Sequence, residues 1–425
     1  MIRSIVNKLK GKGLSSIVIS NVFAKIIAFA GGLILIRILN KEDYGQYSYV
    51  INLYGLATIL ADMGAASAFL QHVNENDHEV MVKRAYMPIA KKVSRIGAVI
   101  SCGVIVLLYF LYPFSYTGIN VIFVMLLALP FFQNSSLLYK TILRADWKNT
   151  QFSIGNIAYG VLFYAFMLPF AYIWGIKGAI VSMYPTIILS MLIYYFFSQK
   201  TTLAGQQSYS LSEEEKKSFY KFSLASQANE MTATLLNLLD VYCLGRIIKD
   251  ANVLASYKVA STIPTALNFL PQSVLVFAAP YFSKNLLNKK WCRKNYKRLV
   301  LANVGMCIMI AVVCVVSSGF VIPAVYGAEY TDAVLCFNIL MIGFVFYGGL
   351  QCPAINILYT QRKIKYSTLL TSCAAVLDLL LNILFIKVWE SPGAAIATAL
   401  VHIIIGVTGT VLVFKVLKER NLDGQ

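Results

Sequence analysis

The chain has 425 residues, of which 58% are hydrophobic and only 13% are charged, and its mean hydropathy is +0.67. Soluble domains are about 45–50% apolar and about 25% charged, so this composition excludes an ordinary water-soluble protein. The net charge of +18 would suggest a nucleic-acid partner if the protein were soluble. We predict no nucleic-acid binding, because the basic residues fall in regularly spaced loops and form no cluster with interleaved aromatic residues.

The apolar residues are grouped in stretches that are long enough to cross a bilayer. A membrane-spanning helix needs about 20 mostly apolar residues. The first stretch already has this length, so we interpret it as a retained membrane helix and not as a cleaved signal peptide. The predicted spans are residues 14–38, 45–71, 94–114, 117–139, 150–174, 177–198, 222–246, 253–282, 299–322, 331–359, 366–388 and 392–416. Because backbone polar groups in lipid must be satisfied within the segment, we expect an all-α polytopic membrane protein with about twelve transmembrane helices.

The distribution of Lys and Arg orients these spans. If the N-terminus is cytoplasmic, 29 of the 37 basic residues lie in cytoplasmic regions and seven lie in or beside the outer turns. The remaining one is Lys25, within the first span. Such a bias follows the positive-inside rule, so we expect both termini to be cytoplasmic.

A polar interval divides the chain almost in half. We predict a basic cytoplasmic N-terminus (1–13), an N-lobe (14–198), a cytoplasmic linker (199–221), a C-lobe (222–416) and a cytoplasmic tail (417–425). Residues 1–13 fit either a short helix lying on anionic lipid or a plain basic flank of the first span. Within the linker, residues 212–217 carry three Glu and two Lys after a Ser.

Weak internal similarity suggests that the lobes are repeats. Trp174 and Gly178-Ala179 recur as Trp389 and Gly393-Ala394, each at an offset of 215 residues. Arg37 and Tyr47 recur as Arg246 and Tyr257, at offsets of 209 and 210. Because six helices are an even number, the two lobes insert with the same orientation. We therefore predict two six-helix lobes in a 6+6 parallel repeat around a central cavity, with the substrate site between the lobes.

The sequence contains no pattern for catalysis, metal binding or nucleotide binding. It has no P-loop, no GxSxG, no HExxH and no EF-hand loop. Seven of the eight cysteines lie in or at the end of apolar stretches and no CxxC occurs, so free thiols are expected. We predict no catalytic residues, no metal site and no cofactor, and therefore a protein that is not an enzyme.

Two groups of polar residues fall within the spans, where each charge costs roughly 2.5–3.5 kcal/mol and is a functional candidate. The basic group consists of Lys25 with Asn21 one turn before it, Arg37 at the outer end of the same span, and Lys258. Each has a structural alternative: Lys25 could neutralise a buried carboxylate, and Arg37 and Lys258 could anchor the chain at the outer interface.

The acidic group consists of Asp62, Glu230, Asp240 and Asp378. We predict that these carboxylates either bind a coupling ion or form intramembrane ion pairs. Asp62 and Asp240 lie toward helix ends, where hydrogen bonds to neighbouring helices are an equal alternative. His402 is a lone histidine in the last span and fits a packed polar residue better than a ligand.

Several short motifs resemble those of bacterial polysaccharide flippases. Residues 33–47 (LILIRILNKEDYGQY) resemble the first helix and turn of that family, and Asp62-Met63-Gly64 resembles the end of its second helix. Leu239-Asp240, Gly245-Arg246 and Tyr257 resemble the matching turn of the second half. Together with the 6+6 repeat, the chain is similar to O-antigen or capsule repeat-unit flippases (Wzx-type) of the multidrug/oligosaccharidyl-lipid/polysaccharide (MOP) superfamily.

This resemblance implies a flippase of the bacterial inner membrane. It would move an undecaprenyl-pyrophosphate-linked oligosaccharide from the cytoplasmic to the periplasmic leaflet by alternating access. The cations Lys25, Arg37 and Lys258, with Asn21, would meet the diphosphate. A coupling ion, H⁺ or Na⁺, could use Glu230 or Asp378. Expected partners are the lipid-linked oligosaccharide, membrane lipids and the polysaccharide polymerase machinery.

Three other functions remain open from the sequence. A lipid II flippase of the same superfamily usually has two more C-terminal helices than the twelve predicted here. A drug/cation antiporter of the superfamily would prefer an acidic cavity, whereas this chain carries basic residues in its spans. A membrane polymerase or glycosyltransferase would present a large outer loop, and every predicted outer turn is short.

Overall fold

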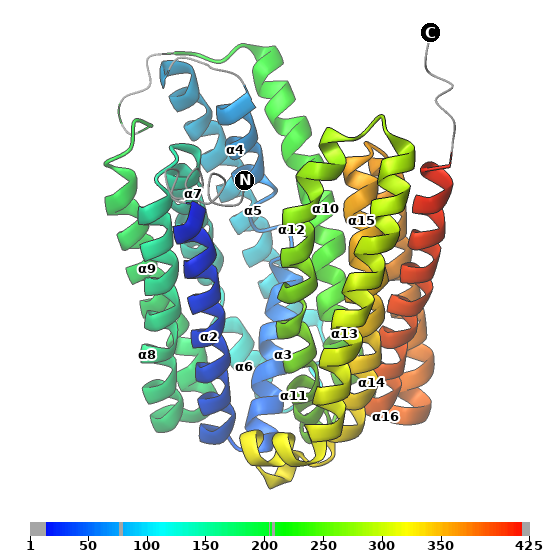
Figure 1. The fold of residues 1–425 in the computed structure, drawn as a ribbon. Coiled ribbons are helices and arrows are strands. Elements are labelled where there is room, and N and C mark those ends of the chain that lie inside the picture. The colour runs from blue at the N-terminus through cyan, green and yellow to red at the C-terminus, as the bar shows by residue number, and fades with distance from the viewer. Residues whose placement is uncertain (1–13, 76–79, 204, 206–208, 419–425) are drawn as a thin grey trace. The chain divides into compact units, whose positions relative to one another are not determined.

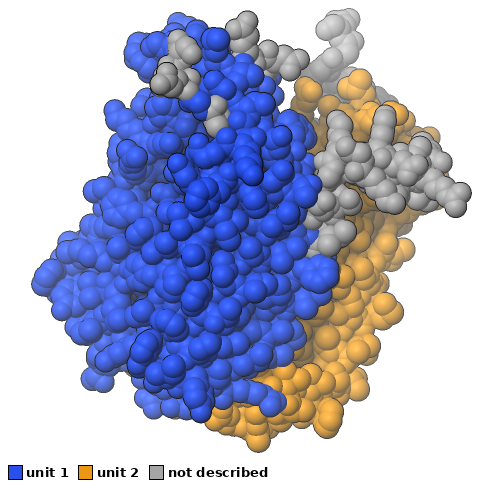
Figure 2. All heavy atoms as spheres, turned by 90° about the vertical axis from the view of Figure 1, so that its left-hand side faces the viewer, with its two compact units in different colours: residues 1–231 blue, residues 232–425 orange. Residues whose placement is uncertain are grey.

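The computed structural model describes residues 14–75, 80–203, 205 and 209–418, and these residues form helices and turns without any strand. The predicted surface helix within 1–13 and most of the predicted tail lie outside the described residues. By its backbone contacts the chain divides into two compact units, Met1–Met231 and Thr232–Gln425 (Figure 2). The division falls inside a helix that begins at Glu213, so part of the predicted linker is helical.

Figure 1 shows the order of the helices along the chain. Unit 1 contains α2 (Leu14–Ile38), α3 (Lys41–Ala57), α4 (Ala65–Glu75), α5 (Val80–Leu111), α6 (Ile119–Val124), α7 (Leu129–Ala145), α8 (Asn149–Val181), α9 (Met183–Ser198) and the first part of α10 (Glu213–Ile247). Unit 2 contains the rest of α10, α11 (Ala251–Leu267), α12 (Phe269–Lys284), α13 (Lys289–Tyr326), η1 (Ala328–Tyr330), α14 (Ala333–Phe346), η2 (Tyr347–Gln351), α15 (Cys352–Thr360) and α16 (Ile364–Val416).

The helices confirm a multi-pass membrane protein. Within the described residues, eight helical stretches are long and apolar enough to span a membrane, and the shorter α9 is also apolar. Five predicted spans differ from single helices. Residues 45–71 are broken between α3 and α4, residues 117–139 between α6 and α7, residues 177–198 between α8 and α9, and residues 253–282 between α11 and α12, and residues 331–359 are interrupted by the π-helix η2. The break after α3 contains Met63 and Gly64, both with positive φ, which ends a right-handed helix.

Helix α16 folds back on itself, so it holds two of the predicted spans. Asn382 and Thr398 both donate hydrogen bonds to the carboxylate of Asp240, at 2.8 Å each. In a straight helix these two residues would be about 24 Å apart, because each residue rises 1.5 Å. The reversal occurs at Glu390, whose φ of 49° and ψ of −128° are not helical.

The same reversal occurs in unit 1 and supports the internal repeat. Helix α8 is interrupted at Gly175, with φ 57° and ψ −137°, at an offset of 215 residues from Glu390. After each reversal a glycine lies against an earlier carbonyl oxygen: Gly178 against Phe170 and Gly393 against Phe385, again 215 apart. A side chain at either glycine would clash with backbone. The Gly-Ala pairs found in the sequence are therefore needed for the chain to turn back.

The helices after the first turn of each unit also begin alike. Asn40 caps α3 by accepting a hydrogen bond from the Asp43 amide at 2.7 Å, and Asp250 caps α11 by accepting one from the Asn252 amide at 2.8 Å. These caps are 210 residues apart, the same offset as Tyr47 and Tyr257. Side-chain caps satisfy amides that have no partner within the helix.

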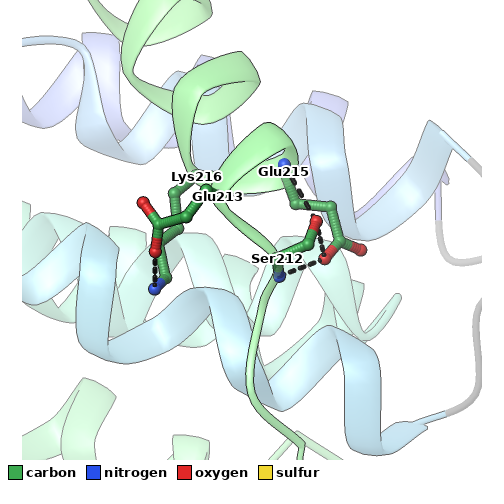
Figure 3. Close-up of polar contacts among 4 residues, drawn as sticks. All are labelled: Ser212, Glu213, Glu215 and Lys216. Carbon is green, nitrogen blue, oxygen red and sulfur yellow. Dashed lines mark hydrogen bonds and ion pairs between the residues drawn. The ribbon is translucent and has the colours of Figure 1, made fainter.

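Helix α10 begins at a capping box (Figure 3). Ser212 donates from its backbone amide and its hydroxyl to the Glu215 carboxylate at 2.7 and 2.9 Å, and the Glu215 amide donates to the Ser212 hydroxyl at 3.3 Å. Lys216 pairs with Glu213 at 2.7 Å. The Ser followed three residues later by Glu is the sequence pattern of this motif. The charged cluster thus starts a helix.

Because the two reversals have nearly the same backbone conformation, we expect substitutions at Gly175 and at Glu390 to have opposite effects on the stability of the protein. Gly175→Ala should destabilise the protein by about 1–3 kcal/mol, because a non-glycine residue is strained at this φ and ψ. Glu390→Gly should be neutral or stabilising, since relief of strain offsets a glycine entropy cost of about 0.5–1 kcal/mol. The measurement is the thermal unfolding midpoint in detergent. Gly319→Ala is the control, because Gly319 has open space and lies within helix α13. A lower midpoint for Glu390→Gly would contradict the assignment of strain.

Candidate functional site

Unit 2 contains a polar cavity of about 550 Å³. Its walls come from α10, α11, α14, η2, α15 and both arms of α16. The charged residues on the walls are Asp240, Lys258 and Asp378, and the other polar residues are Asn237, Tyr257, Ser261, Thr265, Asn268, Tyr347, Gln351, Thr371, Thr398 and His402. Such a set of groups inside a membrane-spanning unit is costly unless it binds something or pairs within itself.

Asp240 is the centre of the polar network. Its carboxylate accepts hydrogen bonds from the Tyr257 hydroxyl at 2.6 Å, the Thr398 hydroxyl at 2.8 Å and the Asn382 amide at 2.8 Å. The donors come from α11 and from both arms of α16. Three donors from different helical segments fix the orientation of this carboxyl group. Asp240 is one of the sequence-predicted acidic residues, and hydrogen bonds to neighbouring helices are what it makes here.

Asp378 lies beside Asp240 and is less satisfied. Its side chain is 2% exposed, and one of its carboxyl oxygens has no donor among the described residues. Its carboxyl group lines the same cavity as that of Asp240, and the Asn382 amide donates both to the Asp240 carboxylate and to the Asp378 backbone carbonyl. Two neighbouring carboxylates repel each other, and a cation or proton bound between them removes this repulsion. The pair is therefore a candidate site for a small cation.

Lys258 lines the same cavity and is half-buried. Within the part of the chain that the structure describes, it forms no ion pair with Asp240 or Asp378. Its ammonium group is held on α11, one residue after Tyr257. The cavity therefore presents both a cation and an acidic pair.

The π-helix η2 brings two further residues to the cavity. Tyr347 and Gln351 are the ends of this segment and both line the cavity. His402 shares a hydrogen bond of 2.8 Å with Gln351, and its ring centroid is 5.1 Å from that of Tyr347. Between them, Gly348 and Gly349 pack closely against α12 and α13. His402 is thus hydrogen-bonded within the cavity wall. Neither Tyr347 nor Gln351 is among the residues predicted from the sequence, although Gln351 is a polar residue within the apolar stretch 331–359.

In unit 1 a second polar cluster connects α2, α7 and α8. Lys140 donates to the Asn156 side-chain oxygen at 3.0 Å, and Asn156 donates to the Asn21 side-chain oxygen at 3.2 Å. The Lys140 ammonium also lies 5.2 Å from the centroid of the Phe152 ring. Lys25 is one turn after Asn21 on α2 and is exposed. Asn21 and Lys25 are predicted site residues. Lys140 is not, because it lies just beyond the predicted span 117–139, among the basic residues of a cytoplasmic loop.

The packing of α2 against α8 fixes the rotation of α2 about its axis, and therefore the side on which Asn21 and Lys25 lie. The Tyr164 hydroxyl of α8 donates to the Ala28 carbonyl at 2.9 Å, and its ring lies directly over Gly31. A side chain at Gly31 would overlap the ring. Arg37 lies in the last turn of α2 and is exposed.

The remaining two acidic residues have local partners in unit 1. Asp62 accepts a hydrogen bond from the Ala66 amide at 2.9 Å and so caps α4. Glu230 on α10 accepts one from the Ser67 hydroxyl of α4 at 3.0 Å. Neither residue lines the cavity of unit 2. No group of three or more His, Cys, Asp or Glu that could hold a metal ion occurs among the described residues.

The repeat shows that the acidic site belongs to unit 2 alone. With the offsets that align the helix turns and reversals, Asp240, Asp378, Asn382 and Thr398 correspond to Gly31, Phe163, Met167 and Met183. The Tyr pair shows the same replacement: Tyr257 donates to Asp240, whereas Tyr47 donates to the Met167 sulfur at 3.9 Å. Unit 1 therefore has an apolar counterpart of the acidic site.

A family model described as "Polysaccharide biosynthesis protein" matches residues 11–286. The chain belongs to this family. No curated protein sequence matches the chain.

Solved structures with a similar fold are transporters of the MOP superfamily. An inward-facing multidrug resistance MATE family transporter is 13% identical, covers 94% of this chain and 98% of its own, and has a TM-score of 0.73. The lipid II flippase MurJ is 14% identical, with coverages of 94% and 87% and a TM-score of 0.74. A Pyrococcus furiosus MOP transporter, described as having a binding pocket of reversed polarity, is 14% identical, with coverages of 96% and 94% and a TM-score of 0.59. The family model thus shows a protein of polysaccharide biosynthesis, and the solved structures show that its fold is the one these transporters have.

Removing the Asp240 carboxylate should destabilise unit 2. Asp240→Leu removes the acceptor that Tyr257, Asn382 and Thr398 share, which should cost about 1–3 kcal/mol in total, because Asn382 and Thr398 keep backbone carbonyl acceptors. Asp240→Asn should cost less, because the amide oxygen still accepts. The measurement is the thermal unfolding midpoint in detergent, with Glu214→Leu as the control at an exposed carboxylate. Equal midpoints for Asp240→Leu and Glu214→Leu would contradict the central role of Asp240.

Proposed function

We propose that this chain is a flippase that translocates an undecaprenyl-pyrophosphate-linked oligosaccharide, an O-antigen or capsule repeat unit. The lipid-linked sugar moves from the cytoplasmic to the periplasmic leaflet of the bacterial inner membrane by alternating access. Both termini of the chain are cytoplasmic in this proposal, as the distribution of Lys and Arg indicates.

The observation that carries the proposal is the chemistry of the cluster on α2, α7 and α8. Lys25 and Lys140 provide positive charge, and Asn21 and Asn156 provide amide groups, on a chain whose family is one of polysaccharide biosynthesis. A diphosphate is a dianion that ammonium groups bind, and sugar hydroxyls bind to amides. The two hydrogen bonds that join Lys140, Asn156 and Asn21 involve no carboxylate. The cluster therefore suits an anionic glycolipid better than a cationic drug.

Lys258 and Arg37 extend the same chemistry. Lys258 lines the cavity of unit 2 without an ion pair among the described residues, so its ammonium group can receive a phosphate oxygen. Arg37, exposed at the end of α2, presents a guanidinium group that binds phosphate in a bidentate manner.

The acidic pair in unit 2 supplies the energy coupling in this proposal. Asp240 and Asp378 bind H⁺ or Na⁺, and the bound ion cancels the repulsion between their carboxyl groups. Oxygen ligands for Na⁺ are available from both carboxylates and from the hydroxyl of Thr398. Occupancy of the site would change the arrangement of both arms of α16, because Asn382 and Thr398 bond to the same carboxylate.

A cation antiporter is the second candidate, favoured only by the Asp240–Asp378 pair. It would use that pair for its cationic cargo and would not need Lys25 or Lys140. Resistance to cationic compounds on overexpression, lost in Asp378→Asn and kept in Lys25→Ala, would support it over the flippase.

Loss of a cation should block export of the polysaccharide. Lys25→Ala, Lys140→Ala and Lys258→Ala should each reduce surface polysaccharide tenfold or more in a strain that lacks its own copy, because a charge-assisted hydrogen bond contributes about 1.5–3 kcal/mol. The measurement is surface glycan per cell at equal amounts of membrane-inserted protein. Lys177→Ala, at an exposed lysine in the turn after Gly175, is the control and should export normally. Wild-type export by all three variants would contradict the proposed substrate.

Ion binding should be measurable without the substrate. Replacing choline by sodium should raise the thermal unfolding midpoint of the purified protein, and Asp378→Asn should abolish the rise, because a ligand that binds only the folded state stabilises it. A midpoint that responds to acid but not to sodium, and loses the response in Asp378→Asn, identifies the proton as the ion. A midpoint that neither ion changes would contradict ion coupling at this pair.

A further inference from the structure

A second pocket, of about 360 Å³, lies in unit 1 between α5 and α7. Lys91, Arg95 and Tyr139 line it at the end where α5 begins and α7 ends. Val99 and Phe131 line its deeper, apolar part. The pocket is separate from the cluster of Lys25, Lys140 and the two asparagines, none of which lines it.

Close packing of α5 forms the floor of this pocket. Gly97 lies against the Ala61 carbonyl, where a side chain would clash with backbone. The Asn134 amide of α7 donates to the Ser94 carbonyl at 2.8 Å and also to the Ala61 carbonyl. These contacts hold α5 and α7 in register, so Lys91, Arg95 and Val99, spaced by four residues, form one stripe beside α7.

The two cations are not used by the protein itself. Among the described residues, neither Lys91 nor Arg95 has a hydrogen-bond or ion-pair partner, and neither does the Tyr139 hydroxyl. Two like charges one helical turn apart repel each other, which costs a few tenths of a kcal/mol. An anion bound between them would remove this repulsion.

The apolar part of the pocket indicates what kind of anion binds. Val99 is 59% exposed and Phe131 is 40% exposed, as expected for side chains that contact lipid tails. Tyr139 at the polar end is a residue enriched at membrane interfaces. A site with cations at its interfacial end and exposed apolar side chains below them matches a phospholipid, with its phosphate at the cations and its acyl chains along α5 and α7. Basic pockets between transmembrane helices are known to bind anionic headgroups.

We propose that this pocket binds the headgroup of an anionic glycerophospholipid, such as phosphatidylglycerol, from the leaflet that the orientation proposed above makes cytoplasmic. Arg95 binds two phosphate oxygens, and Lys91 and the Tyr139 hydroxyl donate to the remaining ones. The bound lipid neutralises the two cations and stabilises the packing of α5 on α7. This site is independent of the transported substrate.

The test compares two double variants that remove the same charges at the same spacing. Lys91→Gln with Arg95→Gln empties the pocket of charge, whereas Lys294→Gln with Arg298→Gln removes an exposed pair from the first turns of α13. Native mass spectrometry measures binding of phosphatidylglycerol and of phosphatidylcholine to the purified full chain. Wild type should bind phosphatidylglycerol roughly tenfold more tightly, and the first double variant alone should lose this preference, since each basic residue contributes about a factor of five.

A stability measurement covers the case in which the first double variant is less well folded. Phosphatidylglycerol should raise the thermal unfolding midpoint of wild type and of the α13 double variant but not of the pocket variant. Equal loss of binding in both double variants would overturn the proposal, because it would show that binding depends on the total positive charge of the surface and not on this pocket. Competition by millimolar inorganic phosphate, or stronger binding of undecaprenyl phosphate than of phosphatidylglycerol, would also overturn it. The flippase proposal is tested separately, by the assay of surface polysaccharide, so that failure of one proposal can be told from failure of the other.

Discussion

The carboxylate of Asp240 holds unit 2 together. Three hydrogen bonds join it to α11 and to both arms of α16, so one side chain connects segments that are up to 158 residues apart. In a membrane, apolar side chains gain little by leaving lipid for protein, and polar contacts between helices are among the few interactions that select one packing. Helices α10, α11 and α16, which meet at Asp240, also line the cavity with Lys258 and Asp378.

The reversal at Glu390 makes that convergence possible, and unit 1 has a matching reversal at Gly175. Each places a non-helical residue directly after a tryptophan and a glycine three residues later against a carbonyl. The backbone conformation is nearly the same in both units, although only one has glycine at the turn. The repeat is therefore preserved in the backbone where the side chains have diverged, and Asp240, Asp378, Asn382 and Thr398 are polar where their counterparts in unit 1 are apolar.

The sequence predicted the spans, the repeat and most of the charged positions, because hydropathy, charge bias and glycine pairs are local signals. It could not predict that Asn382 and Thr398 share one acceptor, since that depends on the reversal at Glu390, which carries no glycine. Tyr347 and Gln351 were not predicted: the polar Gln351 within the apolar stretch 331–359 was an available signal, whereas the π segment that brings both residues to the cavity leaves no mark in hydropathy. Lys140 was counted with the loops, although Asn156 in an apolar stretch was a signal that a polar partner would be near. Asp62 caps α4, and the adjacent Gly64, with φ +71°, was the available sign of a break.

The asymmetry between the units has a functional consequence for the proposed mechanism. A cationic site for a diphosphate and an acidic site for a coupling ion would weaken each other if they shared one small cavity, because their charges would pair. Unit 1 carries Lys25 and Lys140 with amides and has an apolar counterpart of the acidic site, whereas unit 2 carries both carboxylates. Lys258 is the residue of the acidic cavity that could also bind the diphosphate, since it lines the cavity beside Asp240 and Asp378 and is itself a cation. When an ion neutralises Asp240 and Asp378, the attraction that holds the Lys258 ammonium toward them falls, and that group becomes a better ligand for phosphate. Binding of the ion and of the anionic headgroup would then favour each other through a single side chain, which is the coupling free energy that ion-driven transport requires.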